Sequence, residues 1–280
     1  YLVDHVVSGD RLLPAAVLID AALCAGRLAL GRADLALIEL QVLEPTLVPD
    51  AASDDTIQLR LRAEDYEAHV DIYTRPGIDE GEAWVRVASG RLVPCNDAFA
   101  LENEDELLEA RVACPHELSP DDLYETLASK GIVYGEAFRG VGAAWYGHSK
   151  AVITLRPQLE LVRDAARHLI HPVILDSCLH SVGVALAGSD ERNATYLPSG
   201  FARIRLSSAA PVEWACARLT PDGSDAIVAR IDLFDEDGIA VGVVEGARFV
   251  RAVDDTSLLS DALYVYDFAD PRPPLPDTVA

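Results

Sequence analysis

The pattern of apolar residues predicts two buried helices, one in each half of the chain. Residues 15–30 are apolar on nearly every face of a helix, and Pro14 suits the first turn of that helix, where its missing N–H costs nothing. A second apolar segment begins at Pro172, and Asp176 is its one acid. A shorter helix is predicted after Ser119, which suits the N-cap position. Because the two long segments are apolar all round, we expect each helix to be wrapped by a curved sheet.

Alternation of apolar and polar residues predicts antiparallel strands after each long helix. The strands are predicted at 36–43, 56–62, 69–74 and 83–93 in the first half, and at 141–146, 150–155, 202–206, 212–219, 226–234 and 239–250 in the second half. Each half thus repeats one order of elements, which indicates a duplicated fold. The short match between 19–24 and 175–180, in the two helices, agrees with duplication.

The chain has 280 residues, which is enough for one large domain or two packed ones. We predict a first unit at 1–93, an acidic connector at 94–115 and a second unit at 116–262. The proline-rich stretch at 263–280 cannot hold a helix or a strand and is predicted to be a linker. Because the chain opens abruptly at a motif, we expect it to be cut from a longer polypeptide.

Charge limits the partners that the chain can have. The sequence has 23 Lys and Arg residues against 46 Asp and Glu residues, a formal net charge of -23. Such a surface repels nucleic acid and anionic membranes, since both bind basic patches, so neither is an expected partner. The sequence also lacks an apolar run long enough to cross a bilayer. The five cysteines form no Cys-x-x-Cys pair, which indicates a reducing compartment, and we expect a cytoplasmic protein.

His5 is the first candidate for chemistry. It precedes a glycine turn at Gly9 and the start of the first helix, so we expect its imidazole on a loop beside the backbone N–H groups of the helix start. A base beside a group that polarises a carbonyl can remove a proton α to that carbonyl. A single histidine before a glycine is, however, more often structural. His168 and His171 have no Cys or Glu set nearby, so we expect no metal site, and His171 is predicted to cap the second long helix.

Four short motifs occur in order along the chain. They are His5-x3-Gly9-x4-Pro14, Tyr134-Gly135-x2-Phe138, Asp176-x3-His180 and Leu197-Pro198. In this order and at these separations they resemble the dehydratase domain of modular type I polyketide synthases, which make secondary metabolites. The resemblance covers nearly the whole chain. It implies an α+β double hotdog fold, in which two antiparallel sheets each wrap around a central helix, and this agrees with the duplicated pattern.

The resemblance also implies a reaction and a pair of catalytic residues. The reaction is dehydration of a β-hydroxyacyl thioester to an α,β-unsaturated thioester, with the substrate carried on the phosphopantetheine of an acyl carrier protein and no other cofactor. His5 would remove the α proton, and Asp176 would protonate the departing β-hydroxyl. An Asp must be neutral to act as an acid, and an apolar helix disfavours its charged form.

Supporting roles for the other motif residues follow from the same resemblance. His180, one helical turn after Asp176, occupies a position that is Gln or His in the family and orients the acid. Tyr134 would hydrogen-bond near the acid or the hydroxyl, and Gly9 would offer its backbone N–H to the thioester carbonyl. The remaining residues expected at the substrate site are Pro14, Gly135, Phe138, Leu197 and Pro198.

Several other functions stay open at the level of sequence. The same scaffold hosts enzymes that move a double bond, and pyran synthases that dehydrate and then close a cyclic ether. A non-catalytic hotdog that only binds carrier protein and a thioesterase-like hydrolase are further alternatives. Because both His5 and Asp176 are present, dehydration is favoured. The resemblance implies an acyl carrier protein and neighbouring synthase domains as partners, and it leaves a homodimer open.

Overall fold

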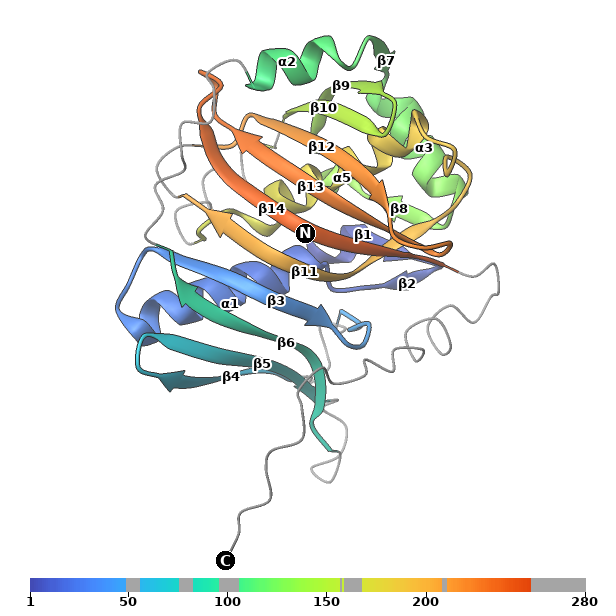
Figure 1. Cartoon of the computed structure of the whole chain (residues 1–280). Coiled ribbons are helices and arrows are strands. Elements are labelled where there is room, and N and C mark those ends of the chain that lie inside the picture. Colours follow the sequence, from blue (N-terminus) through green and yellow to red (C-terminus); the bar gives the residue numbers. More distant parts are fainter. Residues whose placement is uncertain are drawn as a thin grey trace, which may run out of the picture.

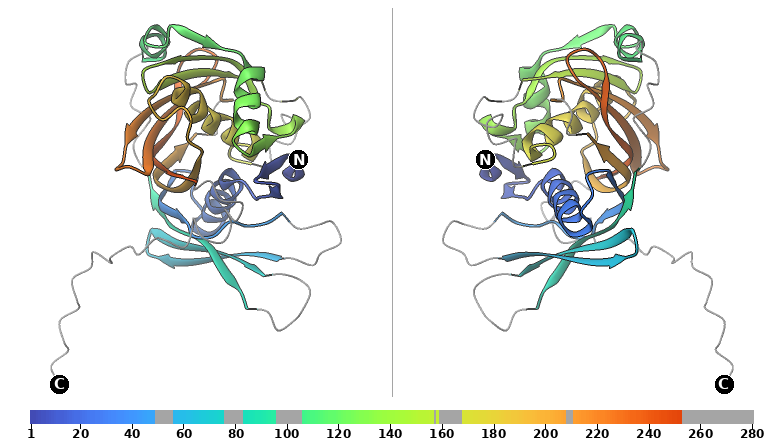
Figure 2. Two further views of the ribbon diagram at one scale, coloured as in Figure 1. Left: turned by 90° about the vertical axis from the view of Figure 1, so that its right-hand side faces the viewer. Right: turned by 90° about the vertical axis from the view of Figure 1, so that its left-hand side faces the viewer.

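Two long helices, α1 (Ala15–Leu30) and α5 (Pro172–Ala187), lie against one curved antiparallel sheet (Figure 1). The computed structural model describes residues 1–48, 56–75, 83–95, 106–156, 158, 168–207 and 211–252. Among these residues, eleven strands form the sheet in the order β4-β5-β6-β3-β11-β14-β13-β12-β10-β9-β7. Figure 2 shows the sheet curving around both helices. The strands are β3 (Leu35–Val42), β4 (Thr56–Glu64), β5 (Glu67–Arg75), β6 (Val85–Pro94), β7 (His116–Leu118), β9 (Val141–Gly147), β10 (Lys150–Leu155), β11 (Tyr196–Leu206), β12 (Trp214–Pro221), β13 (Ala226–Phe234) and β14 (Ala240–Arg251).

The sheet has two lobes that meet where β3 pairs with β11. The N-terminal lobe consists of α1 with β3 to β6, and the C-terminal lobe consists of α5 with β7 and β9 to β14. Leu37 of β3 lies opposite Ile204 of β11, so backbone hydrogen bonds continue from one lobe into the other. Both side chains are fully buried. This arrangement of two helices, each wrapped by antiparallel strands, confirms the predicted double hotdog.

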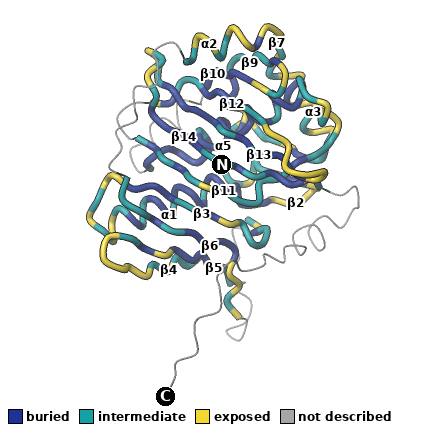
Figure 3. Tube along the Cα trace, viewed as in Figure 1, coloured by how far each residue is buried: buried dark blue, intermediate teal, exposed yellow. Residues whose placement is uncertain are grey.

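Helix α5 is buried on nearly all sides. Thirteen of its 16 residues are buried, against eight of 16 in α1. Figure 3 shows the strands β11 to β14, which lie in front of α5, as mostly dark blue, buried trace. Burying one large apolar side chain contributes roughly 1.5–3 kcal/mol to folding, so packing on every face holds α5 firmly in place. Polar groups on this helix, above all Asp176 and His180, therefore have fixed surroundings.

The predicted helix caps are confirmed. Helix α3 (Pro120–Ser129) begins after Ser119, whose hydroxyl accepts the backbone N–H of Asp122 at 3.1 Å. His171 caps α5, because its Nδ1 accepts the backbone N–H of Val173 at 3.2 Å. Side-chain acceptors at these positions satisfy N–H groups that a helix start leaves without a partner, so each helix begins at a defined residue.

Strand β11 begins earlier than predicted, at Tyr196 instead of residue 202. Pro198 and Gly200 are typical of loops, which explains the error. In the structure, the register of β11 against β14 shifts between these two residues, and the irregularity lets the strand continue.

The domain boundaries proposed from the sequence stay a prediction. Helix α2 (Glu106–Val112) lies within the expected acidic connector, whereas 96–105 and 253–280 fall outside the described residues. Within the described ranges, none of the helices has both the length and the apolar character that crossing a membrane would require.

A second, three-stranded sheet crosses between the lobes in the order β2-β1-β8. Its strands are β1 (His5–Val7), β2 (Asp10–Arg11) and β8 (Ile132–Tyr134). The prediction that His5 lies on a loop was wrong, because His5 is the first residue of β1. A strand of three residues is too short to show alternation of apolar and polar residues. Its partner β8 lies far along the chain, so no local pattern in the sequence predicted β1.

Candidate active site

The small sheet brings His5 of the N-terminal lobe against Tyr134 of the C-terminal lobe. The two residues are direct partners in the antiparallel pair of β1 and β8. Their rings lie edge to face, with centroids 5.5 Å apart. His5, which precedes α1, and Tyr134, which follows α3, are therefore in contact at the junction of the two lobes.

The imidazole of His5 is oriented by one backbone carbonyl. Its Nδ1 lies 2.9 Å from the carbonyl oxygen of Leu12. A carbonyl oxygen can only accept, so Nδ1 carries the hydrogen and donates it. In the neutral ring, Nε2 then keeps its lone pair and is free to act as a base. The backbone N–H of Leu12 also donates to the carbonyl of His5 at 3.1 Å, which fixes the two segments together.

Asp176 lies in the buried part of α5, and its side chain contacts His180 one turn further on. The carboxyl Oδ2 is 3.1 Å from Nε2 of His180, and both residues are about 95% buried, at 5% and 4% exposure. Tyr134 packs on the same group, with its ring centroid 4.2 Å from that of His180. Burial, followed by the nearby Asp176 charge, raises the pKa of Tyr134 well above its ordinary value, so the phenol stays protonated.

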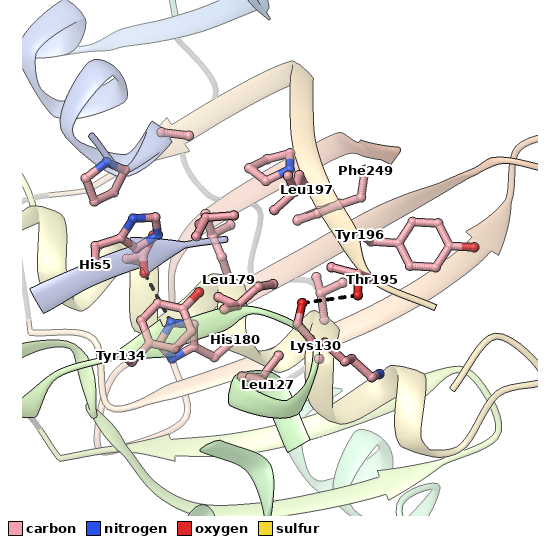
Figure 4. A pocket seen from close by; sticks show the side chains of 18 of the residues that line it. His5, Leu127, Lys130, Tyr134, Leu179, His180, Thr195, Tyr196, Leu197 and Phe249 are labelled. Carbon is pink, nitrogen blue, oxygen red and sulfur yellow. Dashed lines mark hydrogen bonds and ion pairs between the residues drawn. The ribbon is translucent and has the colours of Figure 1, made fainter. Parts of the chain in front are cut away.

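His5 and Asp176 line the same cavity, which has a volume of about 190 Å³. The cavity follows α5 from Asp176 to Ala187, a run of about 16 Å at 1.5 Å per helical residue. Figure 4 shows His5 and Tyr134 on one side of the cavity and Thr195 with Tyr196 on the other. Most of its wall is apolar, and its larger apolar residues include Leu18, Leu127, Val182, Leu186, Leu197 and Phe249.

Five of the eight predicted supporting residues line this cavity. They are Pro14, Tyr134, His180, Leu197 and Pro198.

Gly9 does not reach the cavity. It lies in the exposed turn between β1 and β2, with a φ of 93°, a conformation that favours glycine. The turn accounts for a glycine at this position, and the expectation that its N–H faces a thioester carbonyl stays a prediction.

Gly135 and Phe138 do not line the cavity, but Gly135 contacts Asp4 and Phe138 contacts His5. Gly135 precedes the short helix η2 (Glu136–Phe138), and its N–H donates to the carbonyl of Asp4 at 2.7 Å. A Cβ on Gly135 would overlap the side chain of Asp4, so Asp4, which accepts the N–H of Ala137, would have to shift. The fully buried Phe138 ring lies 5.5 Å from the ring of His5. These contacts support the segment that leads into His5.

Asp20 has a structural role that was not predicted from the sequence. This buried carboxylate of α1 accepts hydrogen bonds from Nδ1 of His168 at 2.6 Å and from the backbone N–H of Leu169 at 3.1 Å. It therefore ties α1 to the segment that leads into α5. The match of Asp20 with Asp176 in the duplicated helices was the available signal, but Asp20 does not line the cavity. No group of three or more His, Cys, Asp or Glu side chains in the described ranges could hold a metal ion.

Comparison with known proteins identifies the family. The chain matches two family models, Polyketide synthase dehydratase N-terminal domain over residues 103–258 and Polyketide synthase dehydratase domain over residues 1–75. It is 33% identical over 260 residues to the spectinabilin polyketide synthase system protein NorB of Streptomyces orinoci, which covers 90% of this chain. The chain belongs to the dehydratase domains of polyketide synthases. It spans only 11% of the length of NorB and 6% of polyketide synthase GfsE of Streptomyces halstedii.

Solved structures show the same fold. The dehydratase domain from the CurF module of curacin polyketide synthase superposes with a TM-score of 0.79 at 25% identity, and the match covers 90% of this chain and 88% of that one. Two structures of inactive CurK dehydratase mutants superpose with TM-scores of 0.78 and 0.80, at 23% and 21% identity. They cover 92% and 91% of this chain, and 89% of each CurK chain. Polyketide synthase dehydratase domains are hydro-lyases that act on β-hydroxyacyl thioesters.

Proposed function

We propose that this chain dehydrates a β-hydroxyacyl thioester held on the phosphopantetheine arm of an acyl carrier protein, with His5 as the base and Asp176 as the acid. The observation that carries the proposal is the meeting of these two side chains, one from each lobe, in one cavity. The ring of Tyr134 connects them, because it packs against His5 and against His180, which contacts Asp176.

The reaction balances with these two groups alone. Nε2 of His5 takes the α proton, and the electrons of that C–H bond form the new double bond between Cα and Cβ. The bond from Cβ to oxygen breaks while Asp176 gives its proton to the oxygen, which leaves as water. His5 then holds one extra proton and Asp176 lacks one, so transfer of one proton resets the site. No electron is gained or lost, and the chemistry requires no redox cofactor.

Two features support this assignment. Asp176 is buried in the wall of the cavity, where His180 holds its carboxyl in place. In CurK, a similar dehydratase, the variants named as inactive replace one aspartate by asparagine and one histidine by phenylalanine.

The apolar stretch of the cavity beyond Asp176 fits the acyl chain of the substrate. The pantetheine arm carries amide groups, and an amide loses its hydrogen bonds to water in such a stretch. An acyl chain loses nothing there and gains about 0.8 kcal/mol for each buried CH₂. We infer that the acyl chain runs along α5 toward Ala187.

The proposed setting is a modular polyketide synthase in the cytoplasm. The acyl carrier protein and neighbouring synthase domains would be the partners, since the similar proteins are long polyketide synthases of which this chain spans a small part. A homodimer is compatible with this setting.

The test measures water loss from a β-hydroxyacyl carrier protein by mass spectrometry. His5→Ala and Asp176→Asn should each lower the rate by roughly 10²–10⁴-fold, the usual contribution of a general base or acid. His148→Ala and Asp237→Asn, at exposed positions, serve as matched controls and should retain the full rate. Full activity in either active-site variant would overturn the assignment. Release of free acid would instead indicate a hydrolase, and a cyclic ether would indicate a further cyclisation.

A further inference from the structure

Tyr124 lies directly behind His180, on the side away from Asp176. It is a buried residue of α3, and its hydroxyl is 3.4 Å from Nδ1 of His180. The other ring nitrogen of His180, Nε2, is the one that contacts Asp176. The three side chains therefore form a buried row in which His180 is the middle member.

The hydroxyl of Tyr124 has a limited set of hydrogen-bond partners. It accepts the backbone N–H of Val141 at 3.1 Å, and its own proton has two acceptors within reach, Nδ1 of His180 at 3.4 Å and the carbonyl of Phe138 at 3.5 Å. A phenol has one proton, and a neutral imidazole has one N–H. Two arrangements of these protons are consistent with the contacts.

In the first arrangement, Tyr124 donates to Nδ1 of His180, so the imidazole hydrogen is on Nε2 and is donated to Oδ2 of Asp176. A neutral Asp176 then carries its proton on Oδ1, where it is available to a substrate. In the second arrangement, Nδ1 donates to Tyr124, and the bare Nε2 accepts the proton of Asp176. That proton is then held by His180 and is less available to a leaving hydroxyl.

We propose that Tyr124 is a positioning residue that selects the first arrangement: its hydroxyl holds His180 in the Nε2–H tautomer and thereby leaves the acidic proton of Asp176 on Oδ1. The proposal rests on Asp176 being the acid. It assigns to Tyr124 a role in the reaction although the residue does not line the cavity.

The surroundings of Tyr124 keep its hydroxyl protonated, so that it can donate a hydrogen bond. Burial raises the pKa of Tyr124 and outweighs the opposing effects of the Val141 N–H and of Arg139. The guanidinium of Arg139 lies 5.2 Å from the Tyr124 ring. Tyr134, whose ring packs against that of Tyr124, is itself kept protonated by burial. The hydroxyl of Tyr124 therefore keeps its proton, and Nδ1 of His180 at 3.4 Å is the nearer of its two acceptors.

Nitrogen-15 NMR of the histidines in the whole chain tests the tautomer directly. The His180 signals are assigned by their loss in His180→Gln. In the unchanged chain near neutral pH, we expect a protonated Nε2 and a bare Nδ1, and in Tyr124→Phe a mixture of both tautomers. A proton on Nδ1 in the unchanged chain, alone or together with one on Nε2, would overturn the proposal. This readout does not depend on activity, so it separates failure of the tautomer from failure of the proposed function.

Kinetics in two backgrounds test the consequence. Tyr124→Phe should lower kcat about tenfold and leave KM within about twofold, as expected for loss of one hydrogen bond that matters in the chemical step. In the His180→Gln background, the same change should lower kcat by less than about twofold, because an amide has no tautomers to select. Tyr146→Phe, in β9 and away from the cavity, is the matched control and should have no effect on kcat.

A purely structural role gives a different kinetic result. Tyr124→Phe leaves the buried Val141 N–H without its acceptor in both backgrounds, so a loss of kcat that came from packing or stability would be equal in both. Equal losses would contradict the proposal. If His180→Gln has no activity at all, the NMR result alone decides.

Discussion

His5 owes its position to contacts that lie outside the cavity. The carbonyl of Leu12 fixes its ring, and the segment before it is held by the contacts of Asp4 with Gly135. The sequence motif identified His5 and Asp176 as candidates because motif residues keep their spacing along the chain. Tyr124 was not predicted, since in the sequence it is one apolar position of an amphipathic helix. The role proposed for Tyr124 depends on its contact with His180, and only folding brings these two residues together.

At this scale, Gly135→Ala is the most informative substitution. The new Cβ would overlap the side chain of Asp4, so Asp4, next to His5, has to shift and its hydrogen bond with the N–H of Ala137 is disturbed. We expect a loss of about 1–3 kcal/mol in the free energy of unfolding and a fall in kcat of roughly tenfold to a hundredfold. Denaturant unfolding and initial rates measure the two effects.

Gly183→Ala is the control for stability. Its Cβ would meet Leu127 at 3.5 Å, an ordinary contact, and alanine is favoured over glycine inside a helix. We expect unchanged or slightly higher stability. If Gly135→Ala were equally harmless, the support of His5 through Asp4 would be wrong.

At the scale of elements, the buried helix α5 carries the proposed acid, Asp176, and lines the cavity from Asp176 to Ala187. The bounds of α1 and most strands were predictable because apolar periodicity is local. The three-residue strands β1 and β8 were not, and neither was the tie between Asp20 and His168, because each depends on a partner far along the chain.

The tie between α1 and the segment before α5 should contribute strongly to stability. Asp20→Ala removes the buried carboxylate that accepts both Nδ1 of His168 and the backbone N–H of Leu169. We expect the free energy of unfolding to fall by about 3 kcal/mol or more. Asp34→Ala, which breaks the exposed pair with Arg32, is the matched control and should cost at most about 1 kcal/mol. Equal losses in urea unfolding would show that the Asp20 contacts add nothing.

The channel along α5 predicts a dependence on acyl-chain length. Gly183 lines the cavity two turns beyond Asp176, and a leucine there would fill part of it. We expect Gly183→Leu to lower kcat/KM about tenfold or more for a long-chain β-hydroxyacyl thioester, and to change it less than about twofold for β-hydroxybutyryl thioester. Equal losses for both substrates would place the pantetheine arm, and not the acyl chain, in this stretch.

At the scale of the whole molecule, one continuous sheet joins the lobes. The duplicated pattern predicted two similar units, but the pairing of β3 with β11 has no local signal, because strand partners are chosen by tertiary packing. The active site depends on this junction, since His5 and Asp176 come from different lobes.

A continuous sheet should unfold as one unit. We expect the urea transitions measured by far-UV circular dichroism and by tryptophan fluorescence to coincide in a Trp84→Phe variant. In that variant, fluorescence reports Trp145 and Trp214 of the C-terminal lobe alone. Two separated transitions would mean that the lobes are independent and that the junction contributes little to stability.

The most direct test of the central claim is a crystal structure of Asp176→Asn with a bound β-hydroxyacyl pantetheine thioester. We predict that Nε2 of His5 lies within about 3.5 Å of the substrate Cα and that the side chain at position 176 lies about 3 Å from the β-oxygen. A substrate bound with its β-oxygen away from position 176, or with its Cα out of reach of His5, would contradict the proposed mechanism.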